Sequence, residues 1–245
     1  MIRPSAVLAI CAASMLCAQT ASVSQFEVAS VKPTRSASNY DSGLRTRRGR
    51  LDAYNVTLKR CIMGAYGVGP HQVSGGPVWL DSDRFEILTK AEQPAGDAEM
   101  MLMLQRLLAD RFKLTLHREV RSMHAYVLEV DKHGPKLEKA EPGESSTNTS
   151  GGNSSVTIDA RRSDMESFAK VLARQLALPV VNRTGLEGAY NLKLSWAPET
   201  NRPSDGATEA SIFTAIREQL GLRLRSEIAP VEILVIDRAE KPSEN

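Results

Sequence analysis

Few residues of this chain have the types and spacing that catalysis or metal binding requires. The chain has 4 histidines, and no pair of them has the spacing that would hold a metal ion from one helix. His117 is the best candidate for a general base, and it shares the polar face of a predicted strand with Lys113, Thr115 and Glu119. A histidine base needs an oriented partner, and the local sequence offers none. A solvent-facing strand position is therefore the favoured interpretation of His117.

A second candidate is the carboxylate pair Asp81 and Asp83, which could serve a hydrolase or a calcium site. The pair lies in a predicted turn between Trp79 and Arg84, where aspartates commonly bond their own backbone. Two carboxylates without further oxygen ligands make a poor calcium site. The chain also lacks a phosphate-binding loop, a dinucleotide-binding glycine pattern and a Gly-x-Ser-x-Gly turn. We predict no catalytic residue, no metal site and no cofactor.

Local positive charge is concentrated in one run. We take its basic side chains as candidate binding residues for an anionic glycan, a lipid head group or an acidic partner: Arg45, Arg47, Arg48 and Arg50. No aromatic residue interleaves the run, and the whole chain has a net charge of only +2, so nucleic acid is not an expected partner. The alternative is a solvated loop without a ligand.

The N-terminus predicts export. Arg3 is followed by the apolar run Ala6–Ala18 and then by small polar residues, which is typical of a secretory leader, 1–23. Lipid attachment at Cys17 is disfavoured because Met15 and Leu16, rather than small residues, precede it. No other apolar run is long enough to cross a membrane, so we expect a periplasmic or extracellular protein without a transmembrane segment.

Loss of the leader leaves Cys61 as the single cysteine, so no internal disulfide can form. Cys61 lies with Leu58, Ile62 and Ala65 at helical spacing, which predicts a packed thiol rather than a nucleophile.

These residues are positioned by two similar halves, 24–137 and 156–245, which a Gly-, Ser- and Asn-rich linker, 138–155, separates. The strongest similarity is between Lys113–Asp131 and Gly221–Asp237, each of which we expect to form two short strands. The periodicity predicts strand–helix–strand–strand–helix–strand–strand in each half. We predict an α+β fold, with mixed or antiparallel sheets and helices packed on one face. The expected helices are 57–66, 97–110, 163–177 and 211–220, the third opened by a capping box from Ser163.

Several ordered motifs resemble one family, the "soil-associated" secreted proteins of unknown function that are abundant in acidobacteria. The motifs are FEVASVKP at Phe26–Pro33, the glycine–proline–tryptophan run at 75–80, LLADRFKLTLHRE at 107–119, GPKL at 134–137, VVNRTGLEGAYNLKLSW at 180–196 and the C-terminal 211–245. The resemblance implies no activity and no site residues. Some relatives are joined to a membrane-bound metallopeptidase sensor, which implies an extracytoplasmic sensing or interaction role. This chain lacks the peptidase's His-Glu-x-x-His motif.

The first hypothesis for function is a non-enzymatic binding or sensing module whose partner is an envelope protein or glycan. The alternative is a cell-envelope hydrolase that uses His117 or the Asp81 and Asp83 pair as its base. A stand-alone structural protein of the envelope is a third possibility that the sequence does not separate from the first.

Overall fold

The computed structural model describes residues 25–34, 42–47, 49–152, 155–198 and 211–242. The predicted leader, 1–23, and Arg48 lie outside them. The described part contains four α-helices and twelve strands, and the strands form three four-stranded sheets, so the α+β class is confirmed. No helix in this part is long and apolar enough to span a bilayer.

The first lobe is an antiparallel sheet of order β1-β5-β3-β2 with two helices. Its strands are β1 (Phe26–Pro33), β2 (Gly43–Arg47), β3 (Arg50–Thr57) and β5 (Arg84–Ala91), and its helices are α1 (Leu58–Tyr66) and α2 (Asp97–Phe112). Every second residue of β5 is buried, as expected for a strand with one face on a core. Thr57 caps α1 by accepting a hydrogen bond from the Arg60 N–H, and Gly67 ends the helix in a left-handed conformation.

The second lobe repeats this design with the sheet order β7-β11-β9-β8. Its strands are β7 (Glu138–Lys139), β8 (Ser146–Gly151), β9 (Val156–Ser163) and β11 (Tyr190–Trp196), and its helices are α3 (Met165–Leu176) and α4 (Ile212–Leu220). Two edge strands, β7 and β8, thus lie within the segment predicted as a linker. The inward alternation expected for Tyr190, Leu192, Leu194 and Trp196 is confirmed.

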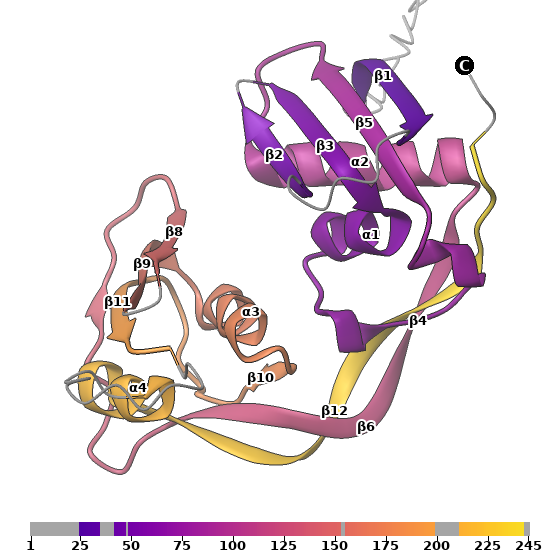
Figure 1. The fold of residues 1–245 in the computed structure, drawn as a ribbon. Helices are drawn as coiled ribbons and strands as arrows, with labels where there is room; N and C mark the ends of the chain where they lie inside the picture. The colour runs from indigo at the N-terminus through magenta and orange to yellow at the C-terminus, as the bar shows by residue number, and fades with distance from the viewer. Residues whose placement is uncertain (1–24, 35–41, 48, 153–154, 199–210, 243–245) are drawn as a thin grey trace, which may run out of the picture.

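A long two-stranded ribbon joins the lobes (Figure 1). It consists of β6 (Thr115–Val130) and β12 (Leu222–Arg238), which pair antiparallel along their length. The prediction of two short strands in each of these segments is wrong. The physical reason is that β6 contains no Gly, Pro, Asn or Asp to make a turn, so its backbone groups pair with the other half instead.

Two three-residue strands complete this third sheet at opposite ends of the ribbon, in the order β10-β6-β12-β4. β4 (Val73–Gly75) lies parallel to β12, and β10 (Val180–Asn182) lies parallel to β6. The short 3₁₀ helices η1 (Pro70–Gln72) and η2 (Val78–Leu80) flank β4.

The ribbon makes the two cores interdependent. Leu234 and Ile236 of β12 are buried in the core of the first lobe, although they belong to the C-terminal half of the sequence. Conversely, Leu128 of β6 is buried in the core of the second lobe. Each lobe is therefore completed by apolar side chains from a strand that starts in the other.

The element order β3–α1–β4–β5–α2–β6 recurs as β9–α3–β10–β11–α4–β12. The irregularities recur too. Asn55 and Arg162 have φ values of 50° and 52°, and each lies two residues before the N-cap of the following helix, Thr57 or Asp164. Positive φ is uncommon for a residue other than glycine, so its presence at matching places is a specific likeness between the lobes.

Candidate functional site

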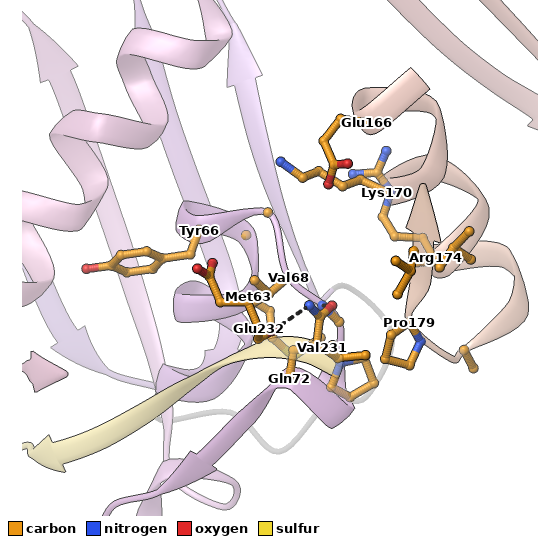
Figure 2. Close-up of a pocket in the computed structure, with 18 of the residues that line it drawn as sticks. Met63, Tyr66, Val68, Gln72, Glu166, Lys170, Arg174, Pro179, Val231 and Glu232 are labelled. Carbon is orange, nitrogen blue, oxygen red and sulfur yellow. Dashed lines mark hydrogen bonds between the residues drawn. The ribbon is translucent and has the colours of Figure 1, made fainter. Parts of the chain in front are cut away.

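A cleft of about 710 Å³ lies between the lobes. One wall is the C-terminal end of α1 with η1, and the opposite wall is α3 with β10 (Figure 2). The centre of β12 contributes Pro230, Val231 and Glu232. Both lobes and the ribbon thus supply residues to one concave surface, which is the usual setting of a ligand site.

The first-lobe wall is mainly apolar, and Gln72 bonds it to the ribbon. Met63 and Val68 line it, and the backbone N–H of Val68 donates to the Met63 carbonyl at 3.1 Å, which fixes the chain as it leaves α1. Gln72 donates from its amide nitrogen to the carbonyl of Glu232 at 3.0 Å, the dashed line in Figure 2. Partial burial raises the pKa of Tyr66, and the positive charge of Arg118 acts in the opposite direction. The Tyr66 phenol is therefore neutral at physiological pH.

The second-lobe wall is a polar stripe of α3. Glu166, Lys170 and Arg174 follow one another at intervals of four residues and point into the cleft from the same side of the helix (Figure 2). The opposite side of α3 is fixed in the core of its lobe by Phe168 and Leu172, both fully buried. The core contacts therefore set which polar side chains face the first lobe.

The charges of the cleft are unbalanced. Its lining includes four basic side chains and two acidic ones: Arg60, Arg118, Lys170 and Arg174 against Glu166 and Glu232. Arg118 and Glu232 bond to each other across the ribbon. Among the described residues, no ion pair involves Lys170 or Arg174. The cleft therefore presents unneutralised positive charge beside apolar surface.

The sequence did not identify these cleft residues. The only local signal was the spacing of Lys170 and Arg174 on a helix, which also fits an ordinary solvated helix face. Lys170 and Arg174 form a cleft wall only because the first lobe lies opposite α3. The periodicity of a helix does not predict which part of the chain lies opposite it.

His117 has the partner that the sequence did not reveal. Its Nδ1 lies 2.9 Å from Oδ1 of Asp237, which is on the neighbouring strand β12, so the expectation of an unpartnered histidine is wrong. The side chains are 54% and 47% exposed and do not line the cleft.

Asp81 and Asp83 lie in the predicted turn but do not act as a pair. Asp81 is 3.0 Å from the ammonium nitrogen of Lys59, and Asp83 is 2.7 Å from that of Lys241. The hydrogen bond from Lys241 is the main cause that lowers the pKa of Asp83. Two separately neutralised carboxylates do not share a proton as an acid–base pair would. Among the described residues, no three His, Cys, Asp or Glu side chains gather as a metal ion would require.

Three of the four candidate arginines are described, and the structure does not bring them to the cleft. Arg45 and Arg47 lie on the edge strand β2, where they alternate with Leu44, which does line the cleft. Strand alternation therefore directs Arg45 and Arg47 to the opposite face of the sheet. Arg50 is directly across from Arg47 in β3. Binding by this run stays a prediction, and Arg48 is outside the described residues.

Cys61 is packed as predicted. It is 1% exposed, and burial raises the pKa of its thiol to about 12. A thiol with such a pKa is neither a nucleophile nor a metal ligand at physiological pH.

Comparison with known families matches residues 59–239 to a family described as a protein of unknown function, DUF3738. The match begins in α1 and ends just after β12, so it includes the whole ribbon, the second lobe and, from the first lobe, β5 and α2, while β1, β2 and β3 lie before it. Neither the curated proteins nor the solved structures gave a match. With about three quarters of its residues matched, the chain belongs to the DUF3738 family of proteins of unknown function.

Proposed function

We propose that this protein is an exported binding module and that the cleft between its lobes holds the ligand. The observation that carries the proposal is the composition of the cleft. Two helices from different lobes face each other there, and one presents Lys170 and Arg174 without a described acidic partner. Unpaired cations beside apolar side chains suit a ligand with both anionic and apolar parts.

Two further features fit this proposal. The predicted leader would deliver the chain to the cell envelope, where an envelope protein or glycan would be its partner. The recurrence of element order and of the positive-φ positions supports an origin of both lobes from one duplicated unit. Duplication of a small domain creates a cleft between the copies without any new fold.

The test is a comparison of two charge-reversed variants in an affinity pull-down from envelope extract. Lys170→Glu with Arg174→Glu reverses the cleft wall. Lys193→Glu with Arg217→Glu makes the same charge change on exposed residues of the same lobe that do not line the cleft. We expect wild type and the second variant to retain the same component and the first to lose it. Equal retention by both variants would show that the cleft is not the binding site.

A hydrolase remains the second candidate, since the Asp237 carboxylate, by accepting a hydrogen bond from Nδ1–H of His117, would orient His117 as a base. In this role His117 would activate a water molecule. His117→Ala should then lower the hydrolysis of chromogenic esters or peptides about a hundredfold, the usual contribution of a general base. An unchanged rate would eliminate this function for His117.

A further inference from the structure

The short strand β10 has one paired edge and one open edge. Its paired edge is defined by two hydrogen bonds at its ends. The Tyr126 N–H donates to the Pro179 carbonyl at 2.8 Å, and the Arg183 N–H donates to the Leu128 carbonyl at 2.9 Å. In a strand, the N–H and C=O of one residue point to the same side, and successive residues alternate. The backbone groups of Val180 and Asn182 therefore point away from β6.

These outward groups have no partner in the described part of the chain. β10 is the terminal strand of its sheet, and no described backbone or side-chain group bonds to the main chain of Val180 or Asn182. Both residues are only partly buried, and both line the cleft. An open strand edge on a concave surface is a template for another extended chain.

The charge beside this edge indicates which chain would fit. α3 leads directly into β10 through Pro179, so Lys170 and Arg174 stand on the wall next to the open edge (Figure 2). Arg60 adds a third basic side chain from the first-lobe wall. Val181 and Val231 provide apolar surface in the same cleft. A strand with acidic residues on one face and apolar residues on the other would match both surfaces.

We propose that the ligand of the cleft is an extended acidic segment of a polypeptide, which adds to β10 as a further strand. The inference rests on the proposed binding function and names its ligand class. Main-chain hydrogen bonds to Val180 and Asn182 would provide binding that does not depend on sequence. Lys170 and Arg174 would select for acidic side chains.

The other open edges are less suited to this role. β8 is longer, but all six of its residues are exposed, and none of them carries a charge. β4 is parallel to β12 much as β10 is parallel to β6, yet no residue of β4 lines the cleft. Of these three edges, only that of β10 combines unpaired backbone groups, a concave surface and positive charge.

The experiment is a titration followed by backbone amide NMR, with the ¹⁵N-labelled protein expressed from its full sequence. The probe is an acetylated and amidated (Val-Glu)₄ peptide. Its controls are (Val-Lys)₄ and two N-methylated forms of (Val-Glu)₄, one methylated on the four Val nitrogens and one on the four Glu nitrogens. An added strand uses the N–H groups of only one of its edges, so one methylated form should lose binding and the other should keep it.

We expect (Val-Glu)₄ to shift the amide resonances of Val180 and Asn182 and to slow their hydrogen exchange. The Lys170→Glu with Arg174→Glu variant should bind it about tenfold more weakly or worse, while Lys193→Glu with Arg217→Glu should bind like wild type. (Val-Lys)₄ should bind more weakly than (Val-Glu)₄.

Equal binding of both methylated forms would overturn strand addition. In that case the proposed function would still stand, provided that the Lys170→Glu with Arg174→Glu variant fails to retain the envelope component in the pull-down. If the protein retains its envelope component but does not bind (Val-Glu)₄, the assignment of an acidic peptide as the ligand is overturned and the proposed function is not. Retention of that component by the charge-reversed cleft variant would overturn both proposals.

Discussion

At the scale of single residues, the glycines that end α1 and α4 are required for different physical reasons. Gly67 and Gly221 both end helices in the left-handed region, with φ of 64° and 63°. A Cβ on Gly67 would meet nothing within 4 Å, whereas a Cβ on Gly221 would lie 2.2 Å from the carbonyl oxygen of Gly134. Conformational freedom is required at both positions, but close packing of backbone against backbone is required only at Gly221.

Alanine at these two glycines should therefore have unequal effects. Gly67→Ala should lower the free energy of unfolding by about 1 kcal/mol, the cost of left-handed backbone for a residue with a Cβ. Gly221→Ala should lower it by about 3 kcal/mol or more, because the segment at Gly134 must also move. Urea denaturation of both variants checks this. Equal losses would show that the contact with Gly134 is unimportant.

The buried thiol gives a second prediction at this scale. Because burial raises the pKa of Cys61 to about 12, the thiol is protonated at pH 8 and does not react as a thiolate. In the protein without residues 1–23, where Cys61 is the single cysteine, we expect an aromatic disulfide reagent to leave the folded state unlabelled at pH 8 and to label it fully in denaturant. Rapid labelling of the folded state would mean that α1 opens readily.

At the scale of elements, each helix is delimited by its own residues. The sequence predicted α3 correctly in position, but its N-cap is Asp164 rather than Ser163. The Asp164 carboxylate accepts from the Ser167 N–H at 2.7 Å, while Ser163 is the buried last residue of β9. Adjacent Ser and Asp are both good caps, and the end of the preceding strand decides between them.

Replacement of this cap should weaken α3 and the cleft wall that it carries. Asp164→Ala should lower the free energy of unfolding by about 1 kcal/mol. Asp164→Asn keeps an oxygen acceptor and should cost much less. Thermal unfolding followed by circular dichroism separates the two variants, and equal destabilisation would argue that charge, not the capping hydrogen bond, stabilises this end of α3.

At the scale of the whole molecule, the ribbon makes the two lobes one cooperative structure. Leu234 and Ile236 fill the first core from the last strand of the chain, and Leu128 fills the second core from β6. A cut between the sequence halves would leave both cores with missing side chains and would expose the edge of each ribbon strand.

A fragment of residues 24–137 should therefore be unfolded in isolation. Mixing it with 138–245 should restore a one-to-one complex with native circular dichroism, because the ribbon can form between two chains. Size-exclusion chromatography and circular dichroism test both points. A monomeric fragment 24–137 with cooperative unfolding would contradict the interdependence of the cores. The prediction also means that ligand binding is better tested with point variants than with isolated halves.

The sequence by itself determined the elements that depend on neighbouring residues. Helical spacing located α1 to α4, alternation gave the inward face of β11, and Cys61 was correctly assigned to a helix core. Fold class followed from the order of these elements. Each of these properties depends on contacts within one turn or one strand, which composition and period record directly.

Tertiary structure alone decided which distant strands pair and therefore what the protein offers to a ligand. Residues 115–130 lack the residues that favour a turn, but nothing in this segment identifies the strand with which it pairs. The strand that pairs with this segment, β12, is about a hundred residues away in the sequence. The same long-range pairing places Asp237 against His117 and sets α3 across the cleft from α1. Such contacts depend on the register between segments that fold together, and local periodicity carries no record of that register.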